Sequence, residues 1–250
     1  MIDPRVLDAM LPYMKEEFGN ASSTEHIYGW NAEDAVNKSR EQIANLIDAH
    51  PSEIFFTSGA TESNNLALVG ATISNKGHSQ HIITVSTEHK AVLDVCKALE
   101  EQGINVTYLS VKRDGLIVLR ELEDEIREDT VAVSVMHANN EIGVIQPIDK
   151  ISDICSKHDI MLHIDAAQSV GKIKLSLKGK HISLISISAH KIYGPKGVGA
   201  LYVNLPNKKN IRPILFGGGH EKGLRAGTLA VHNIVGMGMA AEICLEKIEN

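Results

Sequence analysis

Lys191 occupies a position in the sequence where a lysine could do covalent chemistry. It follows an apolar run over residues 182–187 that predicts a buried strand, and a Gly194-Pro195 turn comes shortly after it. Proteins of the α/β class bind ligands at the carboxyl edge of their sheets, and a lysine held among polar groups there can be tuned to form a Schiff base. Taken alone, however, this position is also compatible with an ordinary surface lysine.

Four other polar segments also follow predicted strands, at residues 58–62, 87–90, 137–143 and 165–168. The first of them places glycine and hydroxyl residues at the start of a helix, which is a natural phosphate cradle. Each segment by itself has a structural explanation, because the same residue types cap helices and form turns. Five such sites after five strands predict that their side chains converge at one edge of a sheet.

An aspartate beside a lysine, with phosphate donors near, suits pyridoxal 5'-phosphate (PLP). The lysine amine forms a Schiff base with the cofactor, and a carboxylate such as that of Asp165 keeps the pyridine nitrogen protonated, which makes the ring an electron sink. We therefore predict PLP as the cofactor. We predict no metal site, because the histidines are scattered over different elements without an HxxxH or HExxH pattern.

Short β-branched runs alternate with longer helical stretches along the chain. Repeated βα units of this kind predict a three-layer α/β/α fold with a mainly parallel mixed sheet. We see no linker and no internal repeat, and therefore expect one domain over residues 1–250. The expected strands cover residues 54–57, 81–85, 105–109, 131–136, 161–164, 182–187 and 198–203, and the expected helices 4–19, 31–49, 60–70, 89–102, 118–127 and 148–158.

Composition narrows the function classes. A net charge of −6 and an aromatic content of 4% argue against direct binding of nucleic acid. No apolar run approaches the ~20 residues that a membrane span needs, and no basic and apolar leader opens the sequence, so we expect a cytoplasmic protein without membrane contact. Cys96, Cys155 and Cys244 are too few and too widely spaced for a disulfide framework, and we expect them to be buried.

The motifs in these segments resemble those of cysteine desulfurases, which are class-V, fold-type I PLP enzymes. The group that serves iron–sulfur cluster assembly is the most similar in these motifs. The resemblance implies a homodimer that takes L-cysteine to L-alanine and passes sulfur, as persulfide, to an iron–sulfur scaffold or a sulfur carrier for tRNA thiolation. It rests on residues 59–65, 88–92, 137–143, 165–171, 188–197 and 217–228, in matching order and spacing.

The resemblance also implies a role for each site residue. Lys191 holds the cofactor and moves protons on the substrate, Asp165 pairs with the pyridine nitrogen, and Gln168 hydrogen-bonds the phenolic oxygen. His89 stacks on the ring and assists acid–base steps, and Asn140 orients the cofactor or substrate. The remaining residues are Ala60, Thr61, Ser188 and His190, which hold the phosphate, Thr228, which reaches the phosphate of the other subunit, and Arg225, which contacts substrate.

In that family the nucleophilic cysteine and the arginine for the substrate carboxylate lie beyond the part that corresponds to Thr228. None of the three cysteines of this chain matches the nucleophile. We therefore expect residues 1–250 to be the PLP-binding large domain without the small domain, as a fragment or as a natural short or split form, and to release little sulfide alone. The alternatives are a non-catalytic PLP-binding or scaffold subunit that pairs with a full-length desulfurase, or another class-V aminotransferase or lyase.

Overall fold

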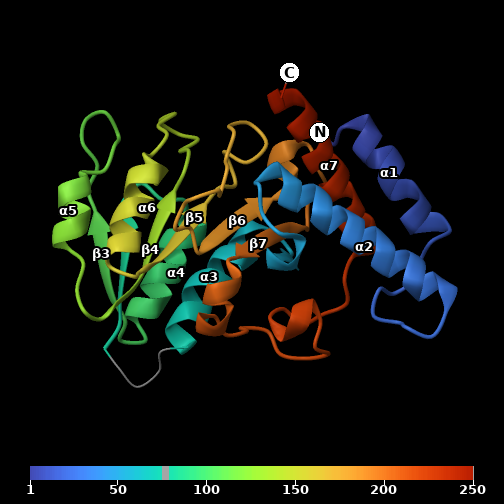
Figure 1. The fold of residues 1–250 in the computed structure, drawn as a ribbon, viewed down its shortest axis with the longest axis horizontal. Helices are drawn as coiled ribbons and strands as arrows, with labels where there is room; N and C mark the ends of the chain where they lie inside the picture. The colour runs from blue at the N-terminus through green and yellow to red at the C-terminus, as the bar shows by residue number, and fades with distance from the viewer. Residues whose placement is uncertain (75–78, 250) are drawn as a thin grey trace.

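The computed structural model describes residues 1–74 and 79–249 (Figure 1). Within these residues, strands form one sheet in the order β1-β7-β6-β5-β4-β2-β3. Strand β7 is antiparallel to both of its neighbours, and the remaining pairs are parallel, so the sheet is mixed and mainly parallel, as predicted. The strands are β1 (Ile54–Thr57), β2 (His81–Val85), β3 (Asn105–Leu109), β4 (Thr130–Met136), β5 (Met161–Asp165), β6 (Leu184–Ser188) and β7 (Gly199–Val203).

The predicted helices are all present, and the long run before Asn250 is also helical. The second helix begins four residues before the predicted start, because the ring of His26 accepts a hydrogen bond from the Gly29 amide and caps it. Histidine is not among the residue types that commonly mark a helix start. The helices are α1 (Pro4–Lys15), α2 (Ile27–Leu46), α3 (Ala60–Ser74), α4 (Lys90–Glu100), α5 (Leu119–Asp124), α6 (Ile148–Lys157) and α7 (Val231–Glu249).

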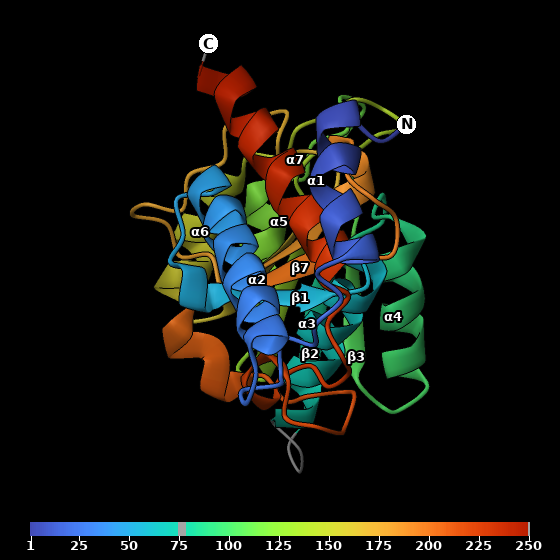
Figure 2. The ribbon, with the colours of Figure 1, turned by 90° about the vertical axis from the view of Figure 1, so that its right-hand side faces the viewer.

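The helices cover both faces of the sheet because successive strand residues point to opposite sides. In β1, Phe55 packs with Leu66 of α3, whereas Phe56 belongs to the larger cluster that contains Ile43 of α2. Helices α3 and α4 thus cover one face, and α2, α5, α6 and α7 cover the other. Helix α1 packs against α7 at one end of the molecule, as the two ribbon views show (Figure 2).

The parallel strands bring the predicted polar segments to one edge. Strands β1 and β6 are both antiparallel to β7 and therefore run in the same direction, which β5, β4 and β2 share. Their carboxyl ends meet at the edge where β7 begins.

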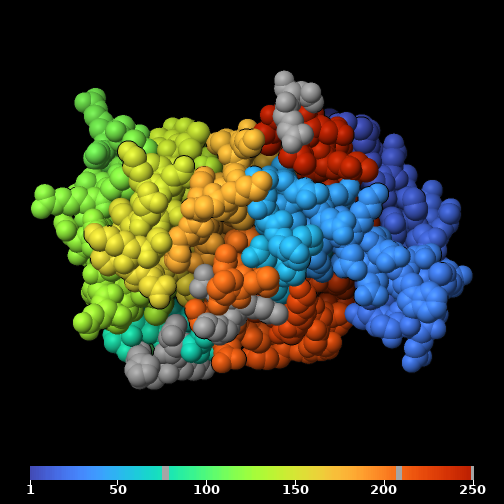
Figure 3. All heavy atoms as spheres, in the orientation of Figure 1, coloured from blue at the N-terminus to red at the C-terminus, as the bar shows by residue number. Residues whose placement is uncertain are grey.

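In the space-filling view, the segment before α7 (orange to red) lies against α2 (Figure 3). In the ranges described, no helix combines the length and the apolar character that crossing a membrane requires.

Candidate active site

A cavity of about 390 Å³ lies at this edge of the sheet. It is walled by segments that follow β1, β2, β4, β5 and β6, together with the turn that leads into β7. Of the eleven residues that the sequence singled out, nine line it, and Arg225 and Thr228 do not. The nine are Ala60, Thr61, His89, Asn140, Asp165, Gln168, Ser188, His190 and Lys191.

One end of the cavity is built to hold an anion. Ala60 and Thr61 begin helix α3, where the first backbone N–H groups have no partner within the helix and the helix dipole favours negative charge. The turn before the helix is fixed by Thr57, whose hydroxyl pairs with that of Ser63 at 2.8 Å and donates to the Gly59 carbonyl at 3.1 Å. The cradle is therefore held in shape by bonds of its own.

Two glycines allow this turn to lie directly on the sheet. Gly59 has φ +153°, which side chains disfavour, and Gly199 is the first residue of β7. A Cβ atom on Gly199 would lie 2.6 Å from the Cα atom of Gly59 and 2.5 Å from the carbonyl oxygen of Ile187. Because backbone atoms occupy that space, a side chain at position 199 would push the cradle away from β6 and β7.

Lys191 and two polar neighbours follow β6. A short 3₁₀ turn, Ala189–Ile192, carries Lys191 to the cavity wall, and it ends at Tyr193, which has φ +63°. The hydroxyl of Ser188 and Nδ1 of His190 are 2.8 Å apart. Burial lowers the pKa of His190, and the charges of Lys191 and Lys196 lower it further. We therefore expect a neutral His190 at neutral pH.

Asp165 ends β5 and is 3% exposed. Its Oδ1 accepts from the Ala167 amide at 3.0 Å, and its Oδ2 accepts from the side-chain amide of Asn64 at 2.9 Å. Burial raises the pKa of Asp165, whereas these two bonds and the charges of His89 and Lys191 oppose the rise. Each carboxylate oxygen can accept one more hydrogen bond. A donor group of a ligand in the cavity could supply it.

His89 caps helix α4. Its Nδ1 accepts from the Ala91 amide at 3.0 Å, so the ring proton of the neutral side chain is on Nε2. The neighbouring asparagines divide their roles: Asn139 donates to the Thr87 carbonyl at 2.7 Å and accepts from the Glu141 amide at 2.8 Å, whereas Asn140 lines the cavity. Asn139 thus stabilises the turn after β4, whereas Asn140 is available to a ligand.

Three polar residues that were not predicted as site residues also support the site. Glu62 and Lys196 line the cavity, and Asn64 holds Asp165. Asn64 has a recognisable signal, because Leu68 lies four residues later and Ala71 seven residues later, both on the buried stripe of α3. A polar residue on such a stripe requires a buried partner. Glu62 has no such local signal, because its partner is distant in sequence.

Glu88 is a further buried acid, and it contacts Met136, which lines the cavity. It is 6% exposed, and its Oε1 accepts from the Met136 amide at 2.6 Å. Its Oε2 is buried without a hydrogen-bond partner among the described residues. Burial raises the pKa of Glu88 well above its usual value. This carboxyl group is therefore expected to remain protonated well above the pH at which an exposed glutamate ionises.

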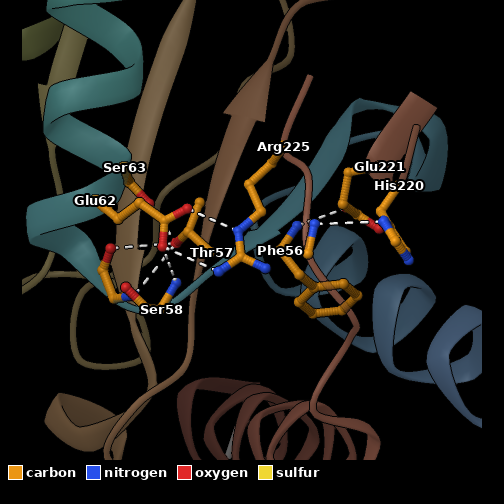
Figure 4. Close-up of polar contacts among 10 residues, drawn as sticks. Phe56, Thr57, Ser58, Glu62, Ser63, His220, Glu221 and Arg225 are labelled. Atoms are coloured by element: carbon orange, nitrogen blue, oxygen red, sulfur yellow. Dashed lines mark hydrogen bonds and ion pairs between the residues drawn. The ribbon is translucent and has the colours of Figure 1, made fainter. Parts of the chain in front are cut away.

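Arg225 and Thr228 lie outside the cavity. The Nε atom of Arg225 donates to Oε1 of Glu62 at 2.7 Å, and its Nη2 donates to Oε2 at 3.3 Å (Figure 4). Thr228 is exposed and lines a separate hollow that also includes Met14 and Phe18. Arg225 is thus occupied by a carboxylate of the protein itself, and Thr228 is placed on the surface beside α1.

The three cysteines are buried in α4, α6 and α7, as expected. Burial raises the pKa of Cys96 and of Cys155 to about 12, so both are thiols at neutral pH. None of the three lines the cavity within the part of the chain that the structure describes. These cysteines are therefore not placed to act as nucleophiles at this site.

Fold and site together match the fold-type I class of PLP enzymes, in which a lysine after a strand faces a buried aspartate. The chain belongs to the class-V aminotransferase family, whose model matches residues 1–250. The cysteine desulfurase IscS of Neisseria meningitidis serogroup A is 54% identical over 248 residues, which are 99% of this chain and 61% of that protein. The mitochondrial cysteine desulfurase of Drosophila melanogaster is 53% identical, over 99% of this chain and 54% of that protein.

Solved structures show the same relationship. A structure titled NifS-like protein superposes with a TM-score of 0.95 at 43% identity, over 99% of this chain and 68% of that one. A structure of SspA in complex with cysteine gives a TM-score of 0.93 at 44% identity, over 96% of this chain and 69% of that one. The chain spans about 61% of the length of the IscS relative.

Proposed function

We propose that this chain binds PLP and forms the cofactor-binding part of a cysteine desulfurase, which converts L-cysteine to L-alanine and transfers the sulfur atom to a thiol as a persulfide. The observation that carries the proposal is the convergence of Lys191, Asp165 and the α3 cradle on one cavity. Relatives named cysteine desulfurase, and a relative solved with cysteine, support the choice of substrate.

The residues present fit PLP in three respects. The side chain of Lys191 has no hydrogen bond or ion pair to another described residue, so its amine is available. Asp165 is buried with spare acceptor capacity and lacks a hydrogen-bonded cation among the residues described, which suits a protonated ring nitrogen. The N–H groups of Ala60 and Thr61 and the hydroxyl of Ser188 suit a phosphate dianion.

Bound PLP would supply an electron sink for a substrate carbanion. The chain's own residues would do the rest. Lys191 would hold the cofactor and move a proton at the substrate Cα atom, and Asp165 would keep a proton on the ring nitrogen. His89 would present its Nε2 proton to the cavity, and Gln168 and Asn140 would orient the ligand. The whole reaction also needs a thiol, for which the described cysteines are not placed.

We also propose a homodimer with sulfur acceptors such as an iron–sulfur scaffold or a carrier protein, in the cytoplasm. The surface formed by Met14, Phe18, Ile27, Tyr28 and Trp30, here named the α1–α2 apolar surface, supports the homodimer. Each of these side chains is at least 48% exposed, and the rings of Phe18 and Tyr28 stack at 5.4 Å. Thr228 lies beside Met14 and Phe18, where a second copy could meet it.

The first test is an absorbance spectrum of the purified chain with PLP, with Lys191→Ala as the variant. A Schiff-base band in the wild type that is lost in the variant is the expected result, because the band requires the Nζ atom of Lys191. Lys178→Ala is the matched control, since Lys178 is exposed and lies outside the cavity, and the change should leave the band intact. The same spectrum in wild type and Lys191→Ala would refute the assigned role.

A second measurement separates the alternatives. Addition of L-cysteine to the loaded wild type should change the spectrum, because the proposed substrate binds at the cofactor. If the band forms but L-cysteine leaves it unchanged, a non-catalytic PLP-binding subunit becomes the better description. Transfer of the amino group to a keto acid would instead favour an aminotransferase.

A further inference from the structure

Glu62 places a negative charge where the proposed phosphate should bind. It follows Thr61 in the first turn of α3 and lines the same cavity. Burial raises the pKa of Glu62, but hydrogen bonds from Arg225 and Ser58 outweigh burial and leave this pKa below its usual value. The carboxylate is therefore ionised at neutral pH. An isolated carboxylate at this position would repel a phosphate dianion.

Arg225 compensates that charge. The guanidinium and the carboxylate form a two-point ion pair, with contacts of 2.7 Å and 3.3 Å. Their side chains are only 18% and 13% exposed, so solvent screens the pair weakly. Oε2 of Glu62 also accepts from the Ser58 amide at 2.7 Å, which fixes the turn that leads into α3. Glu62 thus shapes the cradle while Arg225 neutralises it.

Contacts of Glu221 also hold the segment that carries Arg225. Four residues earlier, Glu221 pairs with Arg40 of α2 at 2.7 Å. Glu221 also accepts from the Phe56 amide at 2.7 Å (Figure 4). Glu221 has φ +49°, a conformation that costs free energy. Its bonds to Arg40 and Phe56 offset that cost. The segment is therefore fastened to β1 and α2 on one side of Arg225, and to α3 through Arg225.

We propose that Arg225 is a positioning residue for the phosphate site: it cancels the charge of Glu62, so that Glu62 can hold the Ser58 turn without repelling the anion. The inference rests on the proposed function and deepens it. It differs from the substrate contact that the family resemblance implied for Arg225, since the guanidinium is already engaged by Glu62.

The test compares wild type, Arg225→Met, Glu62→Gln and the double variant. The dissociation constants of PLP, of inorganic phosphate and of pyridoxal, which lacks the phosphate, are measured on each. Arg225→Met should weaken PLP and phosphate by about tenfold or more, because it leaves an uncompensated carboxylate at the cradle, and should leave pyridoxal unchanged. The double variant should recover most of this loss, since it removes the repelling charge.

Two further variants serve as controls. Arg225→Lys keeps the positive charge and should stay within a few-fold of wild type. Arg120→Met breaks an exposed ion pair with Asp124 and should change none of the three constants. A double variant that binds phosphate as weakly as Arg225→Met would overturn the inference, as would equal losses of pyridoxal and PLP. If the wild type forms no Schiff-base band with PLP, the proposed function is refuted. That outcome is distinct from failure of this inference, because phosphate affinity does not depend on the chemistry of Lys191.

Discussion

Asp165 shows how one buried acid can serve a ligand at the expense of stability. Its pKa is raised mainly by burial, so the folded chain binds this proton more tightly than the unfolded chain does. The resulting stabilisation is present below the unfolded pKa of 3.8 and is lost as the pH rises through the folded value. A protonated ring nitrogen would offset that loss by supplying a donor to the carboxylate.

Asp165→Asn should therefore separate stability from function. At pH 7 the ligand-free variant should melt at the same temperature as wild type or higher, because it carries no buried charge. The Asn64 amide, whose Oδ1 has no partner among the described residues, can turn to accept from the new NH2 group. Each 1 kcal/mol gained corresponds to about 2 to 4 °C. The spectral response to L-cysteine should slow by about 100-fold or more, because an amide cannot keep the ring protonated. A melting temperature well below wild type would contradict this account.

The buried carboxyl group of Glu88 should make the free energy of unfolding depend on pH. Its folded pKa is well above the ordinary value because of burial, so stability should fall as the pH rises from about 4.5 through the folded pKa. Glu88→Gln keeps an acceptor for the Met136 amide and should flatten that fall in urea unfolding experiments from pH 5 to 9. Glu16→Gln, an exposed control, should keep the wild-type slope. Parallel slopes for wild type and Glu88→Gln would refute the prediction.

At the scale of elements, the packing of the α3 turn on β7 determines the cradle. Gly199→Ala would place a methyl group against backbone atoms of Gly59 and Ile187. We expect a loss of about 1–3 kcal/mol in the free energy of unfolding, together with a weaker affinity for PLP, measured by denaturation and by titration.

Gly103→Ala is the matched control for that variant. Gly103 has φ +88° but open space around its Cα atom, and it lies after α4, outside the cavity. It should lose about 1 kcal/mol or more of stability from backbone strain and keep the affinity for PLP. If both variants bind PLP like wild type, the close approach of β7 does not shape the cradle.

At the scale of the whole molecule, the exposed α1–α2 apolar surface predicts self-association. The side chain of Phe18 is 71% exposed and borders the hollow that contains Thr228. Phe18→Asp should shift the protein from dimer towards monomer in sedimentation experiments, because it places a charge in an apolar contact. Leu205→Asp, which changes an exposed apolar residue outside this surface, should leave the dimer intact. A monomeric wild type would refute the proposed homodimer.

Elements with local sequence signals lie where they were predicted. The strands at residues 54–57, 81–85 and 105–109 have the predicted bounds, because short β-branched runs between helices leave little alternative. The polar segments after the strands were also found, since each lies within a few residues of a strand end. The start of α2 was wrong by four residues, because a histidine ring forms its cap.

Hydrophobic periodicity and residue type are sufficient to predict the α/β class and the set of residues that could meet at the carboxyl edge. Which partners these residues have depends on how the chain folds. Glu62 and Arg225 are 163 positions apart, and Asn64 and Asp165 are 101 apart. Ion pairs and buried hydrogen bonds depend on distances of a few ångströms, which no local pattern specifies. The charge balance of the cradle therefore emerged only from the folded chain.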